Sequence, residues 1–150
     1  MTIDSDISTL NSLIKTTLDS VKGFEEAAEH SDSGRYASTF REFAGERRQV
    51  VSLLQEEVRR LGGNPEDDSS FLAAAHRTFL DLKQALTNRE DRAIINEVER
   101  GEDYLKEKYN DALREDLSPQ TRSVIEQAYG SVRAGHDRAS ALKHSLESHS

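Results

Sequence analysis

Residues 61–70 read LGGNPEDDSS, and this stretch divides the chain into two helical halves. The consecutive glycines Gly62 and Gly63 follow a long helical pattern, as is typical where a helix ends. Pro65 stops that pattern, and the acidic and serine residues behind it offer N-caps to a shorter helix that carries apolar residues from Leu72 to Leu86. The segment over about residues 63–89 is therefore expected to be a long connection that contains one short helix.

Four longer stretches around this connection repeat apolar residues at the spacing of one helix face. We expect helices over about residues 4–30, 36–61 and 90–113, and a last helix with Ser118 as its N-cap and Pro119 as its first residue. The predicted inward positions are Ile7, Leu10, Ile14, Leu18, Val21, Ala28, Tyr36, Phe40, Phe43, Val50, Leu54, Val58, Leu61, Ile94, Ile95, Val98, Leu105, Tyr109, Ala112, Leu113, Ile125, Ala128, Tyr129, Val132, Ala139 and Leu146.

These elements predict an all-α, single-domain protein over residues 1–150. Helices of about 25–30 residues are about 40 Å long, and the connection is long enough to run back along most of that length. Two antiparallel hairpins joined by a long crossover form the ferritin-like four-helix arrangement, which we expect here. A coiled-coil rod is the alternative, but no a/d heptad pattern runs unbroken past the prolines and glycines.

The composition excludes several classes of function. The chain has no cysteine, which excludes disulfide scaffolds, cysteine zinc sites and thiol nucleophiles. A formal net charge of −8 argues against nucleic-acid and anionic-membrane partners, because both bind basic surfaces. No apolar run approaches the length of a membrane span, and the acidic N-terminus lacks the basic start of a signal peptide. We therefore expect a cytoplasmic protein.

Four polar residues fall among the apolar positions, one on each long helix: Glu25, Arg47, Glu102 and His136. Counted from the two hairpin turns, they lie within roughly two to three helical turns of one another. A buried charge without a partner is costly, so these side chains must meet each other, water or a metal ion. We expect one buried polar layer that contains all four.

A glycine lies within two positions of each of these polar residues, although glycine lowers helix stability. Close approach of neighbouring helices would compensate for this cost, and so would a local distortion of the helix. The sequence does not distinguish these two explanations. The four glycines are Gly23, Gly45, Gly101 and Gly135.

Several stretches together resemble the bacterial DUF2383 family, a domain of unknown function, and the likeness spans almost the whole chain. They include Lys22-Gly23-Phe24-Glu25-Glu26-Ala27-Ala28, the run Glu57-Val58-Arg59-Arg60-Leu61-Gly62-Gly63, Glu99-Arg100-Gly101-Glu102-Asp103 and His136-Asp137-Arg138. That family is regarded as ferritin-like, so the resemblance implies the same bundle.

The ferritin-like class includes di-iron proteins with Glu on the first and third helices and Glu-x-x-His on the second and fourth. By this resemblance Glu25 and Glu102 match the first and third helices. The second helix has Glu46 without the histidine, and the fourth has His136 without the glutamate. Glu25, Glu46, Glu102 and His136 are therefore the candidate ligands for iron or another divalent metal, in a degenerate site.

Three functions remain open. The first is a noncatalytic binding or stress-associated module, without catalytic residues or cofactor, that forms a homo-oligomer through an exposed helix face. The second is a metal-dependent oxidoreductase or iron-handling protein that uses the polar layer. The third is a ligand pocket beneath the crossover, near Phe71, His76 and Phe79. No phosphate loop, nucleophile elbow or His-Glu-x-x-His motif occurs.

Overall fold

The computed structural model describes residues 2–30, 34–67 and 91–148. These residues form four long helices and contain no strand: α1 (Ile3–His30), α2 (Gly34–Arg60), α5 (Asp91–Leu113) and α6 (Pro119–Ser148). The all-α expectation and the extents of the four long helices are confirmed. The expected short helix lies outside the described residues, as do Phe71, His76 and Phe79.

Local signals explain where these helices begin and end. Thr2 Oγ1 accepts the N–H of Ser5 at 3.0 Å in the first turn of α1, as a capping side chain does. α2 ends before Gly62, whose φ of 86° is the left-handed conformation that glycine adopts readily. α6 begins after Ser118, whose carbonyl accepts the N–H of Arg122 at 2.9 Å.

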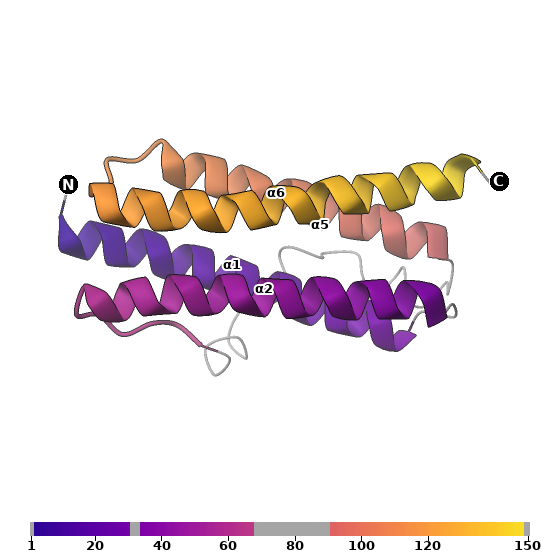
Figure 1. The fold of residues 1–150 in the computed structure, drawn as a ribbon, viewed down its shortest axis with the longest axis horizontal. Helices are drawn as coiled ribbons and strands as arrows, with labels where there is room; N and C mark the ends of the chain where they lie inside the picture. Colours follow the sequence, from indigo (N-terminus) through magenta and orange to yellow (C-terminus); the bar gives the residue numbers. More distant parts are fainter. Residues whose placement is uncertain (1, 31–33, 68–90, 149–150) are drawn as a thin grey trace.

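The helices run antiparallel within two hairpins, α1 with α2 and α5 with α6 (Figure 1). Across the bundle α1 contacts α5 and α2 contacts α6. The end of α1 and the start of α2 lie at the end of the bundle opposite the connection between α5 and α6. α2 therefore ends at one end of the bundle, and α5 begins at the other.

Two clusters of buried apolar side chains form the core, and the predicted inward positions on the described side chains fall in or against them. We call them cluster A and cluster B. Cluster A contains Leu10, Leu13, Ile14, Leu18, Val50, Val51, Leu54, Val58, Leu105, Tyr109, Ala112, Leu117, Ile125, Ala128 and Val132. Cluster B contains Val21, Phe24, Ala27, Ala28, Tyr36, Phe40, Phe43, Ala44, Ile94, Ile95, Val98 and Ala139.

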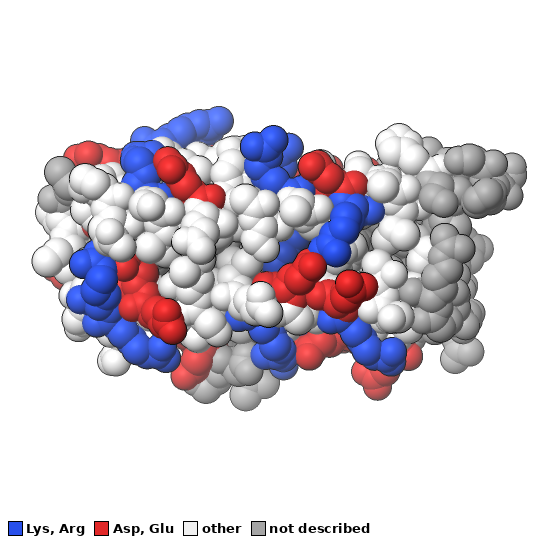
Figure 2. All heavy atoms as spheres, in the orientation of Figure 1, with Lys and Arg blue, Asp and Glu red and all other residues white. Residues whose placement is uncertain are grey.

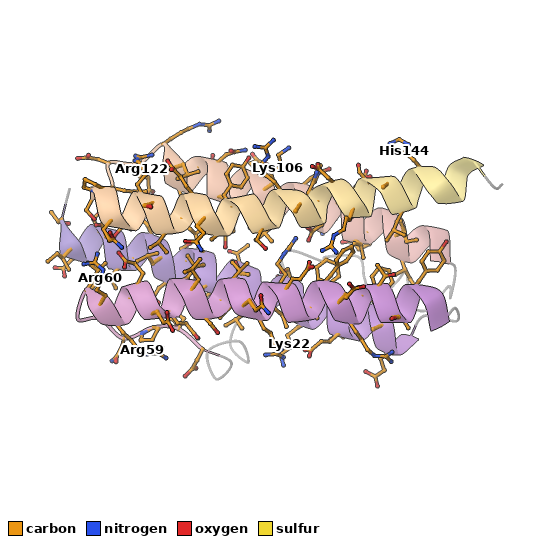
Figure 3. The ribbon with its side chains drawn as sticks, viewed as in Figure 1. Lys22, Arg59, Arg60, Lys106, Arg122 and His144 are labelled. Atoms are coloured by element: carbon orange, nitrogen blue, oxygen red, sulfur yellow. The ribbon has the colours of Figure 1, made fainter. Side chains whose placement is uncertain are left out.

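The described surface carries charged side chains of both signs. Positive and negative side chains are interspersed on the face drawn in Figure 2, and Lys22, Lys106 and His144 point outward in Figure 3. Among the described residues Ile3 is the large hydrophobic side chain that is exposed. Within the same residues, no helix combines the length and the hydropathy that crossing a membrane requires.

Candidate functional site

A buried ion pair lies at the level where cluster A meets cluster B. Arg47 on α2 is 2% exposed and Glu102 on α5 is fully buried. Arg47 Nη1 donates to Glu102 Oε1 at 2.8 Å, and Nη2 donates to Oε2. Nη2 also lies 3.5 Å from the carbonyl oxygen of Val132 on α6. This two-pronged geometry is the one that a guanidinium forms best with a carboxylate, and it engages both carboxylate oxygens.

Each of the four helices contributes to the surroundings of this pair. The Phe24 ring of α1 lies 5.6 Å from Arg47 Cζ, within the range of a cation–π contact. On α6, Gly135 is buried, and a Cβ built there would overlap Arg47 Nη2 and would lie 3.4 Å from Glu102 Oε2. The guanidinium therefore occupies the space that a side chain at position 135 would need.

A buried tyrosine lies on the cluster A side of the pair. The hydroxyl of Tyr109 lies 2.8 Å from Thr17 Oγ1, and Thr17 donates its own hydrogen to the carbonyl of Leu13 at 2.7 Å. Tyr109 is therefore the donor to Thr17. Burial raises the pKa of Tyr109 to about 12, although the hydrogen bond with Thr17 and the positive charge of Arg47 act in the opposite direction. The phenol is neutral at physiological pH.

Glu25 does not join the buried pair, which corrects the expected layer. Its side chain is 42% exposed, and both of its carboxylate oxygens accept hydrogen bonds from Arg48 Nη2, at 3.0 and 3.2 Å. Its neighbour Phe24 is fully buried and takes the inward position instead. The apolar pattern locates a stripe on α1, but adjacent residues differ by about 100° around a helix, and Glu25 falls at the edge of that stripe.

His136 also lies at the edge of the layer rather than against Arg47. Its Nε2 lies 2.5 Å from Asp103 Oδ1 on α5, and its Nδ1 lies 3.4 Å from Asp137 Oδ1. Gly135 takes the inward position that the sequence suggested for His136. Asp103 was not among the expected site residues, although its place directly after Glu102 was a signal that could have found it.

Glu46 pairs with Arg138 across the interface between α2 and α6, and the Arg138 guanidinium lies 4.6 Å from the centre of the Phe43 ring. The four candidate metal ligands thus belong to four separate pairs. Within residues 2–30, 34–67 and 91–148, no three Asp, Glu or His side chains come together in a way that could hold a metal ion. The described donor set does not fit a two-metal centre.

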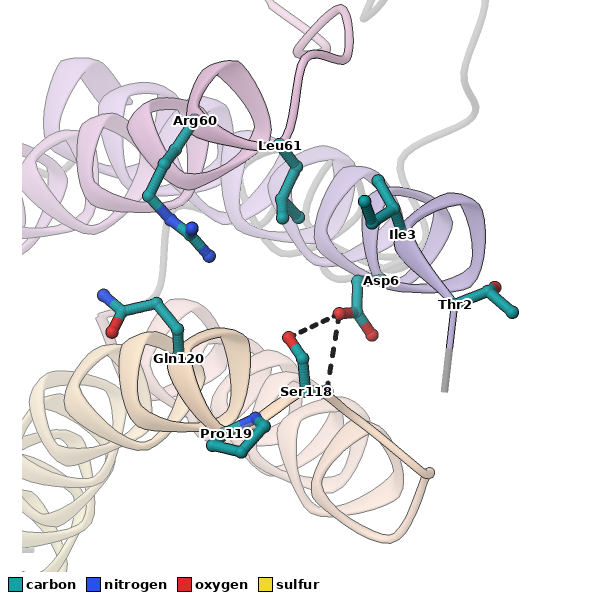
Figure 4. Close-up of a pocket in the computed structure, with 8 residues that line it drawn as sticks. All are labelled: Thr2, Ile3, Asp6, Arg60, Leu61, Ser118, Pro119 and Gln120. Atoms are coloured by element: carbon teal, nitrogen blue, oxygen red, sulfur yellow. Dashed lines mark hydrogen bonds between the residues drawn. The ribbon is translucent and has the colours of Figure 1, made fainter.

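A second polar network, which was not expected from the sequence, joins three helices at one end of the bundle. Asp6 of α1 is 1% exposed, and its Oδ2 accepts the hydroxyl hydrogen of Ser118 at 2.6 Å. Asp6 Oδ1 is also buried and has no hydrogen-bond partner among the described residues. A cavity of about 530 Å³ opens beside them, bordered also by Arg60 and Gln120 (Figure 4).

Glu57 extends this network to α2. Its carboxylate accepts two hydrogen bonds from Arg60, at 2.6 and 2.7 Å, and one from the Thr121 hydroxyl of α6 at 3.0 Å. The hydrogen bonding from Arg60 lowers the pKa of Glu57, burial opposes that effect, and Thr121 lowers the pKa further. Because the Thr121 hydroxyl belongs to α6, Glu57 ties α2 to α6.

The family model for a domain of unknown function, DUF2383, matches residues 5–115. This range contains α1, α2 and α5 almost entirely, and with them Arg47 and Glu102. No curated protein matches the chain. Because the matched range covers well over half of the chain, this protein belongs to the DUF2383 family.

Proposed function

We propose that this chain is a noncatalytic helical bundle, a binding or stress-associated module whose central polar groups hold its helices in place. One observation carries the proposal: each of the four candidate metal ligands already has a partner within the chain. A carboxylate whose two oxygens both accept guanidinium hydrogens is also a poor general acid or base, because the guanidinium stabilises its charged form. The four pairs are Glu25–Arg48, Glu46–Arg138, Glu102–Arg47 and His136–Asp103.

We also propose that the bundle has the ferritin-like arrangement, with a long crossover between its two hairpins. Two facts support this topology. The first is that α2 ends at one end of the bundle and α5 begins at the other. The second is that α2 has 27 residues and α5 has 23, so these helices are about 35–40 Å long. The chain between Arg60 and Asp91 therefore has to cover that distance, whereas an up-and-down bundle would need only a short loop.

The alternative is a metal-binding oxidoreductase or iron-handling protein that uses Glu25, Glu46, Glu102 and His136. A metal at Glu102 would have to displace the Arg47 guanidinium from its carboxylate. Moving that guanidinium out of the pair would cost several kcal/mol, because it would leave a buried charge without its partner. The binding of the metal would have to offset this cost, although its other candidate ligands already belong to pairs of their own.

Iron binding separates the two functions. Protein purified without chelator would be analysed for metals, then titrated with Fe(II) without oxygen and finally exposed to air. We expect substoichiometric metal and no protein-dependent absorbance change, with Glu102→Gln behaving like the parent chain. Stoichiometric iron with an oxygen-dependent absorbance band that Glu102→Gln abolishes would contradict the noncatalytic assignment.

A further inference from the structure

Gly135 differs from Gly45 and Gly130, which also lie within helices, in what surrounds it. A Cβ built at Gly130 on the same helix, or at Gly45 on α2, would have nothing within 4 Å. A Cβ at Gly135 would meet the Arg47 guanidinium and the Glu102 carboxylate. Glycine is the least favourable residue in a helix interior apart from proline, so the buried guanidinium gives a physical reason for glycine at this position.

We infer that Arg47 and Gly135 form a matched pair that closes the centre of this bundle to metal ions. The guanidinium supplies beside Glu102 the positive charge that a metal would supply in a metal-binding bundle, and Gly135 provides the space for it. The inference rests on the proposed noncatalytic function and names the residues responsible for it.

The guanidinium of Arg47 balances the charge of Glu102. Glu102 is fully buried, and an ionised carboxylate there needs a compensating cation. Arg47 provides one positive charge, and both oxygens of the carboxylate accept its hydrogens. The pair is neutral, so a divalent ion at this place would either have to expel the guanidinium or add two uncompensated charges to a low-dielectric site.

The rotation of α6 about its own axis turns His136 away from this pair. Because Gly135 faces Arg47, the next residue is turned by about 100° around the helix. His136 therefore faces Asp103 at 2.5 Å rather than Glu102. Gly135 thus leaves space for the guanidinium. The same rotation of α6 turns the imidazole of His136, the candidate nitrogen ligand, away from the buried carboxylate of Glu102.

A double-mutant cycle tests the matched pair. The parent chain, Gly135→Ala, Arg47→Met and the double variant would be compared by thermal denaturation. We expect Gly135→Ala to lower the melting temperature of the parent chain, because the new methyl group displaces the guanidinium. In the Arg47→Met background the same substitution should raise the melting temperature by about 1–4 °C, because alanine favours a helix and the guanidinium no longer occupies the space that the methyl group needs.

Gly130→Ala is the matched control, since it lies on the same helix and has open space; it should leave the melting temperature unchanged or raise it in both backgrounds. If Arg47→Met does not fold, Arg47→Met/Glu102→Leu removes both charges and replaces that background. An equal effect of Gly135→Ala with and without Arg47 would overturn the inference.

Binding of Mn²⁺ alone provides the second readout, measured by equilibrium dialysis of the parent chain and of Glu102→Gln. We expect no 1:1 binding that depends on Glu102. One bound Mn²⁺ per parent chain that is lost in Glu102→Gln would overturn the inference. The denaturation cycle uses neither iron nor oxygen, so its failure is distinguishable from failure of the noncatalytic assignment, which iron oxidation would reveal.

Discussion

Two adjacent arginines on α2 show how burial changes the effect of one side chain. Arg47 and Arg48 each donate two hydrogen bonds to a glutamate, Arg47 to Glu102 and Arg48 to Glu25. The side chain of Arg47 is 2% exposed and that of Arg48 is 44% exposed. Water and salt screen the outer pair, whereas loss of Arg47 would leave a carboxylate unpaired in the core.

We therefore expect Arg47→Met to lower the free energy of unfolding by about 3–5 kcal/mol, the usual cost of removing one partner of a buried ion pair. Arg48→Met, the control, should lower it by no more than about 1 kcal/mol. Urea denaturation of the two variants and the parent chain gives both values. Similar midpoints for the two variants would show that Glu102 does not depend on Arg47.

At the scale of the helices, Glu57 connects α2 to α6 through Thr121 and makes this contact sensitive to acid. The pKa of Glu57 lies below its ordinary value of 4.5 in the folded chain, chiefly because of the hydrogen bonds from Arg60. The unfolded chain therefore binds a proton at a higher pH than the folded chain does. The stabilisation is complete above the unfolded pKa and is lost as the pH falls through the folded pKa.

Glu57→Gln should therefore make stability less dependent on acid pH. We expect the unfolding free energy of the parent chain to fall more steeply below pH 4.5 than that of Glu57→Gln. Glu56→Gln, at the exposed neighbouring position, should follow the parent chain. Urea denaturation at a series of acid pH values measures the slopes, and parallel curves for Glu57→Gln and the parent chain would refute the role of Glu57.

For the molecule as a whole, the ion pair lies between two apolar clusters that the same four helices share. Each of α1, α2, α5 and α6 contributes buried side chains to cluster A and to cluster B. A helix cannot lose its packing in one cluster without weakening its position in the other. The bundle should therefore unfold as one cooperative unit.

Leu54→Ala in cluster A and Phe40→Ala in cluster B test this cooperativity. Each should lower the unfolding free energy by about 2–5 kcal/mol, because both side chains are buried and truncation leaves a cavity. Native-state hydrogen exchange should show that each variant lowers the protection of the most stable amides in both halves of the bundle. Loss of protection confined to the half that carries the substitution would contradict a single cooperative unit.

The residues of the central layer show how far the sequence could predict this site. Arg47 and Glu102 were expected among the core positions, and both are buried there. Glu25 and His136 were expected beside them, but Phe24 and Gly135 take those inward positions. Apolar spacing defines a stripe about 100° wide, and that width does not resolve which of two adjacent residues faces the centre.

The extents of the four long helices follow from the sequence alone, because capping residues, glycines and apolar spacing act over a few residues of the chain. Which charges meet was decided by the tertiary structure. Arg47 and Glu102 lie 55 residues apart, and their contact depends on the rotation and the axial position of α2 and α5. Those two quantities are set by packing among all four helices, which no local pattern records.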